Sequence, residues 1–297
     1  MRGAYSLAVP AALLAAYFLV PNSYFKYEAV YWAVMSITML GAVTLVEAGL
    51  VNFGYGMYVA AGAYTAALLF KHLKIGEVAV AIPLSAAVGA AFGAVTGLAL
   101  AKLRGIFYAL SSLALSMVLY GFLVKFYYFT GGSDGVTLYG ATIGGQPLGM
   151  DALALLTAAA LATALWFRHK YLQWGIWHLA RGIRENEVKL WSLGVDTGRT
   201  VVALSAFAGL WGGLGGSLLA YLTAHVSPEL SFWAFSGFVV AGALVSAQAS
   251  YGLGFLVGGL IARALNVSAF YTNAYELSIG LGLLAAFAAA KLWKRHA

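Results

Sequence analysis

Long stretches without any charged residue are the feature that most restricts how this chain can fold. Such runs include residues 3–25, 29–46, 48–70, 78–101, 105–124, 152–167, 200–228, 230–262, 264–275 and 277–290. A helix needs about 20 predominantly apolar residues to cross the hydrocarbon core of a bilayer, and most of these runs approach that length. Only 9% of the residues are charged, whereas about a quarter are charged in an ordinary soluble domain. The pattern therefore predicts a chain that crosses a membrane many times.

The runs predict one all-α domain, residues 1–297, folded as a polytopic transmembrane helix bundle of about ten spans. The run at 230–262 is too long for one span, and its polar middle at 246–252 favours a tight turn, so we divide it there. The predicted helices cover residues 4–20, 28–46, 56–70, 78–101, 106–126, 150–167, 199–223, 232–248, 252–270 and 275–292.

Lysine and arginine residues indicate how this bundle is oriented. With ten spans and both termini in the cytoplasm, twelve of these residues fall on the cytoplasmic side and four outside, while Arg263 falls within a span. Cytoplasmic loops of membrane proteins carry an excess of Lys and Arg. The bias predicts a multi-pass protein of the cell membrane, surrounded by lipid, with both termini inside. It also explains the net charge of +7 without a nucleic-acid partner.

Glycines four residues apart recur in the predicted spans. Helices in lipid associate by close packing, which small residues at this spacing permit. We expect these positions to pack helices within one bundle in preference to joining subunits. The spacing is found at Gly89, Gly93 and Gly97, at Gly209 and Gly213, at Gly212 and Gly216, and at Gly254 and Gly258.

A second glycine cluster interrupts the chain near residues 47–56. Glu47, Asn52, Gly54 and Gly56 lie there between two apolar runs. Glycine and asparagine in that position indicate a broken or re-entrant segment, which survives at membrane depth only when it is buried in protein or lines a water-filled cavity. Interrupted helices of this kind mark transport pathways. The alternative interpretation is an ordinary cytoplasmic turn with Glu47 solvated at the membrane interface.

The loop at 168–199, on the predicted cytoplasmic side, contains an amphipathic helix at about 180–194. Its apolar residues Leu179, Ile183, Leu190 and Leu193 fall near one helical face. Gly194 follows the last of them, where a left-handed C-terminal cap is expected. This helix can lie on lipid, act as a simple connector, or insert its apolar face into a groove on a cytoplasmic partner.

Several motifs resemble the permease subunits of prokaryotic branched-chain amino acid ABC importers. The sequence RGIRENE at 181–187, followed by Leu-Gly at 193–194, is similar to the cytoplasmic loop of one of the two homologous permeases of such importers. Further stretches resemble the family in the same order, namely GAYTAAL at 62–68, RGIFYA at 104–109, TGGSDG at 130–135 and VSPELSFW at 226–233. The chain departs from the family pattern at 245–248, which reads VSAQ in place of a Gly-Gly-x-Gly turn, and at 52–56, which reads NFGYG.

The resemblance implies a subunit of an ATP-driven importer for branched-chain amino acids or related small amino acids and amides. An extracytoplasmic binding protein would deliver the solute and dock on the outer loops at 127–149 and 223–231. A homologous permease subunit and two cytoplasmic ATPase subunits would complete the assembly. Because ATP drives transport only through an element that links the two sites, the helix at 180–194 is the expected coupling helix.

The resemblance also implies a role for individual residues of this helix. We expect Ile183, Leu190 and Leu193 to form the docking face for an ATPase subunit. Polar contacts and the end of the helix complete the expected coupling site, which consists of Arg181, Ile183, Arg184, Glu185, Asn186, Glu187, Leu190, Leu193 and Gly194.

The chain itself carries no motif for catalysis or for a cofactor. It has no GxxxxGK[ST] phosphate loop, so ATP must be bound by partner subunits, and it has no HExxH metal spacing. We therefore expect neither enzymatic activity nor a bound cofactor or metal. The alternative function class is a stand-alone secondary transporter or channel, since breaks near 47–56 and 246–254 can be interpreted as a repeated feature of two halves.

Arg263 lies about eleven residues into the ninth predicted span. A charge at that depth is costly unless it faces a cavity or a partner. Two interpretations follow, either a place on the translocation pathway together with Glu47, Asn52, Gly54 and Gly56, or pairing with a group such as Glu276.

Overall fold

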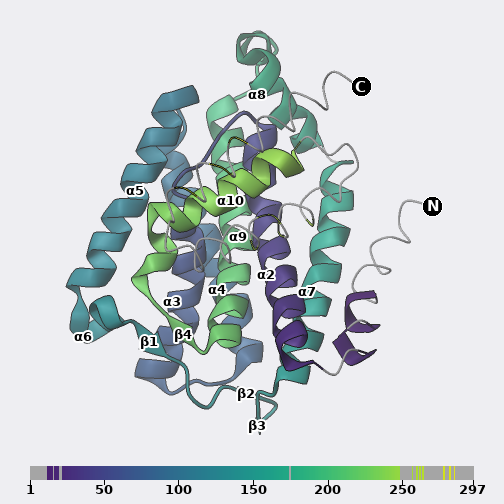
Figure 1. Ribbon diagram of the computed structural model, residues 1–297. Coiled ribbons are helices and arrows are strands. Elements are labelled where there is room, and N and C mark those ends of the chain that lie inside the picture. The colour runs from purple at the N-terminus through teal and green to yellow at the C-terminus, as the bar shows by residue number, and fades with distance from the viewer. Residues whose placement is uncertain are drawn as a thin grey trace.

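The computed structural model describes residues 12–15, 17–19, 22–173 and 175–247, and the single positions 256, 259, 261, 263, 277, 281 and 284. Its longer helices run between two ends of the molecule, with α8 at one end and the short strands β2 and β3 at the other (Figure 1). We call these the α8 end and the hairpin end. The helices are α2 (Ser23–Glu47), α3 (Gly56–Leu73), α4 (Val78–Leu100), α5 (Gly105–Lys125), α6 (Tyr127–Thr130), α7 (Met150–Tyr171), α8 (Gly175–Ser192), α9 (Thr197–Thr223) and α10 (Trp233–Ser246).

Five of these helices, α2, α4, α5, α7 and α9, are long and apolar enough to cross a membrane. The predicted all-α transmembrane bundle is thereby confirmed, and the protein is a multi-pass membrane protein. The number of ten spans stays a prediction, because only single positions are described in the spans expected at 252–270 and 275–292, and much of the one at 4–20 lies outside the described residues.

The helix limits agree with the sequence pattern to within a few residues, with two informative exceptions. Helix α2 begins at Ser23 and not at residue 28, because the side chain of Asn22 accepts the backbone N–H groups of Tyr24 and Phe25 and caps the helix. Helix α7 continues to Tyr171 and does not end at residue 167. Arg168, in its last turn, is buried beside Glu47 of this chain, so its charge does not end the helix.

Short strands at the hairpin end were not predicted. Strand β1 (Val136–Thr137) pairs antiparallel with β4 (His225–Val226), and β2 (Thr142–Ile143) pairs with β3 (Gln146–Pro147). Glu77, which precedes α4, accepts the backbone N–H of Gly144 at 2.8 Å and the hydroxyl of Thr142 at 3.2 Å. The Gly144 N–H foremost holds the pKa of the Glu77 carboxyl below its ordinary value. These contacts tie the 126–149 loop to the bundle.

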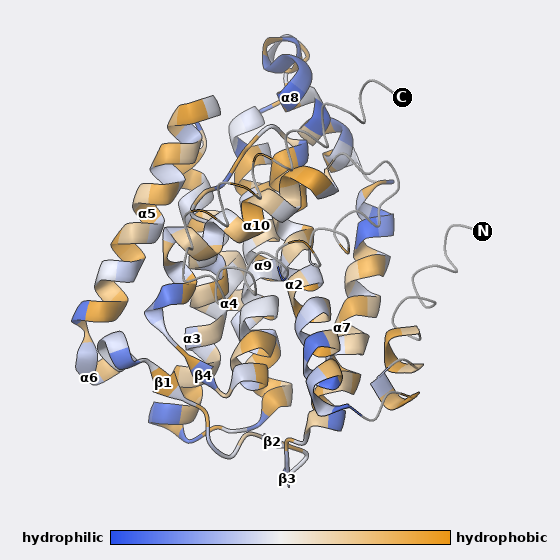
Figure 2. Cartoon of the chain, in the orientation of Figure 1, coloured by the Kyte–Doolittle hydropathy of each residue, from blue (hydrophilic) through white to orange (hydrophobic). Residues whose placement is uncertain are grey.

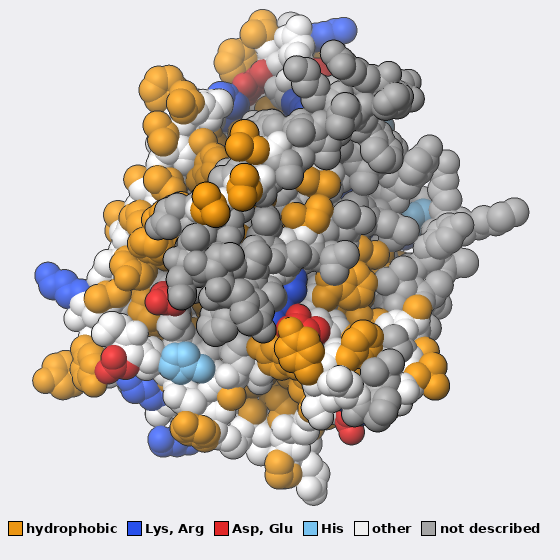
Figure 3. Space-filling view, in the orientation of Figure 1, with side chains coloured by type: hydrophobic (Ala, Val, Ile, Leu, Met, Phe, Trp, Pro, Cys, Tyr) orange, Lys and Arg blue, Asp and Glu red, His pale blue; other side chains and the backbone are white. Residues whose placement is uncertain are grey.

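Helices α2 and α9 form the centre of the bundle. In their most apolar windows 89% and 67% of residues are buried, against 33% in α4 and 28% in α5. Helix α5 displays mostly hydrophobic residues, whereas α8 is largely hydrophilic (Figure 2). Hydrophobic side chains also cover the left edge of the surface, where Figure 1 places α5 (Figure 3). Lipid tails are apolar, so such a face is stable in a bilayer without further cover.

Glycines hold α4 against α9, as their spacing predicted. A Cβ added to Gly89 would overlap the carbonyl oxygen of Gly209, and a Cβ on Gly209 would overlap that of Gly89. Gly93 and Gly97 meet Ser205 of α9 in the same way. The predicted packing within the bundle is thereby confirmed for this pair of helices. Gly254 and Gly258 lie outside the described residues.

We expect Gly209→Ala to destabilise the protein by about 1–3 kcal/mol, the usual cost of an extra methyl group in a closely packed contact. The matched control is Gly121→Ala on α5, where an added Cβ would have no atom within 4 Å. That control should be neutral or slightly stabilising, because alanine favours a helix over glycine. Thermal unfolding in detergent measures both. Equal melting temperatures for the two variants would contradict the close contact.

Candidate functional site

The predicted break after α2 turns back into the middle of the bundle. Gly49, with a positive φ of 76°, reverses the chain after Glu47. The hydroxyl of Tyr55 then donates to the backbone carbonyls of Thr38, at 2.8 Å, and Ala208, at 3.0 Å. Thr38 and Ala208 lie near the midpoints of α2 and α9. The break is therefore buried in protein, and the alternative of a solvated turn is wrong.

Asn52 organises the turn within this break. Its side-chain oxygen accepts the backbone N–H of Gly54 at 2.9 Å, which forms a local Asx turn. Its amide nitrogen lies 3.4 Å from the hydroxyl of Tyr58, and that hydroxyl lies 2.9 Å from Oγ1 of Thr96 on α4. Asn52 is only 3% exposed. A buried polar chain thus connects the break with α3 and α4.

A second break approaches the same level from the hairpin end. After β4 the chain enters the bundle through the 3₁₀ turn η2 (Pro228–Ser231) before α10 begins. The hydroxyl of Ser116, at the middle of α5, donates to the carbonyl of Ser231 at 2.5 Å. Pro228 and Ser231 are buried, whereas Glu229 is exposed. The expected docking of a binding protein on the loop at 223–231 stays a prediction.

The two breaks meet at the centre. The backbone N–H of Gly56 donates to Oγ of Ser236 at 2.9 Å, and a Cβ on Gly56 would overlap the carbonyl oxygen of Leu230. A Cβ on Gly54 would overlap the carbonyl oxygen of Ser112 on α5. Both glycines are required here because backbone approaches backbone. We call this contact of residues 52–56 with 230–236 the central crossing.

A cavity of about 490 Å³ lies between the central crossing and the hairpin end. Its lining comes from the halves of α2, α5 and α9 nearest the hairpin end and from the segment 225–238. It includes Tyr31, Tyr120, His225, Glu229, Trp233 and Phe238. This volume falls within the range of small-molecule sites. No sequence pattern indicates the cavity, because the segments that form its walls are distant from one another in the chain.

Glu47 is held by an ion pair that the sequence did not reveal. The guanidinium of Arg168 donates to both of its carboxylate oxygens, one of them at 2.9 Å. The two side chains are only 14% and 7% exposed. Glu47 therefore fastens the end of α2 to the end of α7. The pair excludes a solvated Glu47, and the sequence did not indicate it because Arg168 is 121 residues away. A place for Glu47 on the translocation pathway stays a prediction.

Arg263 is likewise paired. It donates to the carboxylate of Glu28 on α2 at 2.8 Å, and its guanidinium lies 3.9 Å from the ring centre of Tyr31. The sequence suggested Glu276, which lies outside the described residues. Pairing between helices accounts for a charge at this depth. Because Tyr31 also lines the cavity, the pair lies beside it.

Helix α8 differs in two ways from the expected helix at 180–194. It spans Gly175–Ser192 and is kinked at Asn186, where φ is −161° and ψ is 89°. The side-chain oxygen of Asn186 accepts the backbone N–H of Lys189 at 3.0 Å and so caps the second half. Gly194 has the expected positive φ, 79°, after the last turn. The predicted cap at Gly194 is confirmed.

The expected docking face of α8 is only partly free. Ile183 is 6% exposed and belongs to the core, and the side chain of Leu190 lies against Gly182. Ile183 therefore faces this chain, which corrects the expectation for it, while Leu190 is only partly buried and its docking role stays a prediction. Leu193 is 70% exposed. The exposed apolar residues of the second half of α8 and its end are Val188, Trp191 and Leu193.

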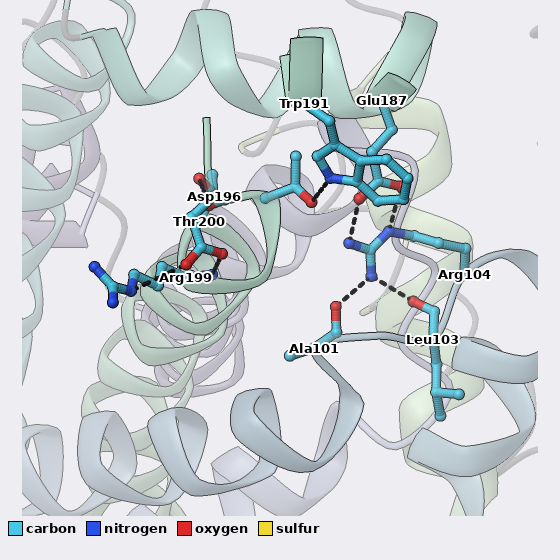
Figure 4. A network of polar contacts seen from close by, with 9 residues as sticks. Ala101, Leu103, Arg104, Glu187, Trp191, Asp196, Arg199 and Thr200 are labelled. Atoms are coloured by element: carbon cyan, nitrogen blue, oxygen red, sulfur yellow. Dashed lines mark hydrogen bonds and ion pairs between the residues drawn. The ribbon is translucent and has the colours of Figure 1, made fainter. Parts of the chain in front are cut away.

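The polar residues of α8 divide in the same way. The Arg104 guanidinium donates to both carboxylate oxygens of Glu187, at 2.9 and 2.6 Å, and also to the carbonyls of Ala101 and Leu103 (Figure 4). Glu187 is thus an internal contact and not a free docking residue. Arg181 lies over the ring of Trp177. Arg184, Glu185 and Asn186 are exposed.

The pair between Arg104 and Glu187 connects α8 with the turn between α4 and α5. Partial burial, the largest single influence, would raise the pKa of the Glu187 carboxyl. The hydrogen bonds from Arg104 and Thr197 and the positive charge of Arg104 together outweigh it and hold that pKa below its ordinary value. The stabilising contribution of the pair is therefore present above the ordinary pKa. It is lost as the pH falls through the lowered value.

We expect the double variant Glu47→Leu/Arg168→Met to unfold at a higher temperature than Glu47→Leu alone. Removal of one partner leaves a buried, unpaired charge, which costs about 3–5 kcal/mol, whereas removal of both avoids that cost. Thermal unfolding in detergent measures the two variants beside the wild type. A double variant that is less stable than the single one would contradict a buried pair at this position.

We expect Arg104→Gln to increase amide hydrogen exchange in residues 187–192 by about fivefold, since a partly exposed charged pair contributes about 1 kcal/mol. Lowering the pH through the pKa of Glu187 should have the same effect after correction for the intrinsic exchange rate. The variant Glu187→Gln should lack this pH dependence. An unchanged exchange rate in Arg104→Gln would show that the pair does not hold α8.

Comparison with known proteins agrees with this geometry. Residues 24–286 match the family described as the permease component of branched-chain amino acid transport systems. Two curated relatives are the high-affinity branched-chain amino acid transport system permease proteins LivM of Salmonella typhimurium and Escherichia coli. They are 28% and 27% identical over 218 residues.

These alignments include 65% of this chain, and the chain spans about half, 51%, of the length of each relative. No solved structure matches the chain. The family match, by contrast, covers most of the sequence, including both breaks and α8. The chain therefore belongs to the family of permease components of branched-chain amino acid transport systems.

Proposed function

We propose that this chain is the membrane-spanning subunit of an ATP-driven ABC importer. It would pass branched-chain amino acids, or related small amino acids and amides, across the cell membrane of a prokaryote. The observation that carries the proposal is the central crossing, where two interrupted segments meet at the middle of the bundle of a permease-family protein. Broken helices at the bilayer midplane are the usual sites of solute passage.

The crossing suits a barrier that can open. Its contacts are few and directional, with the Gly56 N–H on Ser236 and the Ser116 hydroxyl on Ser231. The cavity lies between the crossing and the hairpin end, and Asn52 connects the crossing to Tyr58 and Thr96 through a buried chain of hydrogen bonds. Relative movement of α3 and η2 would connect the two sides. Asn52, Gly54 and Gly56 thus keep their proposed place on the pathway, whereas Glu47 and Arg263 fasten helices.

ATP would be bound and hydrolysed by two partner subunits on the α8 end, because the sequence has no phosphate loop. In this arrangement the α8 end and both termini are cytoplasmic. The hairpin end, with the loop at 126–149, receives an extracytoplasmic binding protein, and a homologous permease subunit completes the assembly. The bias of Lys and Arg toward the α8 side supports this orientation.

Helix α8 has the properties of a coupling element in this scheme. One face is fixed to the chain through Ile183 and Glu187, while Val188 and Leu193 are exposed. Movement of the exposed face would displace Arg104 and the start of α5. The middle of α5 contacts both breaks through Ser112 and Ser116. A continuous set of packed elements therefore links the α8 end to the crossing.

We expect the wild-type chain, reconstituted in proteoliposomes with its ATPase subunits and partner permease, to support ATP-dependent uptake of L-leucine delivered by the binding protein. The double variant Val188→Asp/Leu193→Asp should bind the ATPase subunits at least about tenfold more weakly, because charges replace the exposed apolar contacts. Ser192→Asp, which adds a charge at an exposed neighbouring position, is the control and should bind normally.

Co-purification in detergent measures ATPase binding, and radiolabelled uptake measures transport. Retention of the ATPase subunits by the double variant would contradict docking through α8. Uptake by the wild-type chain in the absence of any ATPase would contradict the importer and favour a stand-alone transporter.

A further inference from the structure

The cavity between the central crossing and the hairpin end is lined by a carboxylate, that of Glu229. Glu229 belongs to η2, and the residues that follow it touch the crossing, since Leu230 lies over Gly56 and Ser231 accepts the hydroxyl of Ser116. Ser116 is at the middle of α5, a membrane-spanning helix. Glu229 therefore directly precedes residues that touch the crossing, and its own side chain is exposed.

Within the described part of the chain, no hydrogen bond or ion pair reaches the carboxylate of Glu229, and its side chain is exposed to the cavity. By contrast, the acidic residues Glu47 and Glu28 of α2 are only 14% and 22% exposed, and each pairs with an arginine. Among the described residues, Glu229 is thus a carboxylate that lines the cavity without joining two helices, so it is available to a cationic ligand.

The surroundings of Glu229 indicate which ligand. Aromatic side chains dominate the lining, with Tyr31 and Tyr120 facing the cavity from α2 and α5, and Trp233, Phe235 and Phe238 from α10. Aromatic faces attract cations and also bury aliphatic groups. A carboxylate among aromatic rings therefore suits a primary ammonium group carried on an apolar side chain. Besides the tyrosines, His225 is the other titratable side chain in the cavity lining among the described residues.

We propose that this cavity is a solute-binding site within the permease itself, in which Glu229 accepts the ammonium group of an amino acid and the aromatic residues contact its aliphatic side chain. The inference rests on the proposed function and adds to it a site of selection in the membrane subunit. Solute would stay bound there, on the hairpin side, until the two segments of the central crossing move apart.

Binding of three related compounds tests the proposal. They are L-leucine, 3-methylbutylamine, which keeps the ammonium and the side chain but lacks the carboxylate, and 4-methylpentanoate, which lacks the ammonium. Binding is measured on the purified complex of permease and ATPase subunits in detergent, without ATP or binding protein. In Glu229→Gln, binding of L-leucine and of 3-methylbutylamine should weaken about ten- to a hundredfold, as expected when a charged hydrogen bond is lost. Binding of 4-methylpentanoate should not change.

Asp134→Asn is the matched control, because it removes a carboxylate at the same end of the molecule, in the turn η1 (Gly132–Asp134), outside the cavity. It should bind all three compounds as the wild type does. Glu229→Asp, which keeps the charge, should retain most of the preference for ammonium compounds. This variant shows whether the loss of L-leucine binding in Glu229→Gln is caused by the missing charge or by misfolding. Equal binding of L-leucine by Glu229→Gln and wild type, or no binding by the wild type at millimolar concentration, would overturn the proposal.

The absence of cysteine from the sequence allows a second, local measurement. Ser227→Cys places the only thiol of this chain in the cavity lining, and Ser133→Cys places it in η1, outside the cavity. A cationic thiosulfonate should modify Cys at 227 faster than an anionic one, L-leucine should slow that reaction, and Glu229→Gln should abolish the charge preference. Modification at 133 should show none of these effects.

Failure of this inference is distinguishable from failure of the proposed function. If the wild-type assembly takes up L-leucine with ATP but L-leucine neither binds nor protects the cavity, the importer stands and the site within the permease is rejected. If no ATP-dependent uptake occurs, the proposed function fails first.

Discussion

Every interruption of a helix in this protein has to satisfy its backbone polar groups without water. In hydrocarbon an unpaired N–H or C=O costs several kcal/mol, so a broken segment persists only where protein supplies the partners. Here the partners are specific. Tyr55 donates to carbonyls of α2 and α9, Ser116 donates to Ser231, and Ser236 accepts the N–H of Gly56. These few bonds allow two interrupted segments to meet at the centre of a membrane bundle.

The rest of the bundle keeps that meeting point in place. Glycine contacts bring α4 against α9 at backbone distance, and buried ion pairs fasten α2 to α7 through Glu47 and Arg168. The same physical constraint underlies both features, since lipid offers no hydrophobic drive for helix association and no solvent for a charge. At the α8 end, Arg104 and Glu187 extend the chain of contacts to the surface on which partner subunits are proposed to act.

The spans were predictable because charges are so rare that their positions mark helix ends. The break at 47–56 was also predictable, since Asn52, Gly54 and Gly56 stand out between apolar runs. What the sequence did not reveal are pairings across large separations, such as Glu47 with Arg168 and Glu28 with Arg263. No local pattern encodes them.

The second break at 228–231 was missed because Pro228 and Glu229 are typical of an outer loop. The role of Ile183 was predicted wrongly because an apolar helix face can pack against its own chain as well as against a partner.

The most direct test of the central crossing as the barrier to solute uses the cysteine-free sequence. Ser116→Cys/Ser231→Cys places two thiols where α5 touches the second break, and a short, reducible bifunctional reagent joins them in the reconstituted importer. If the two segments must separate for solute to pass, ATP-dependent L-leucine uptake stops on crosslinking and returns on reduction, while each single variant is unaffected by the reagent. Uptake at the wild-type rate by the crosslinked double variant would contradict a barrier at this place.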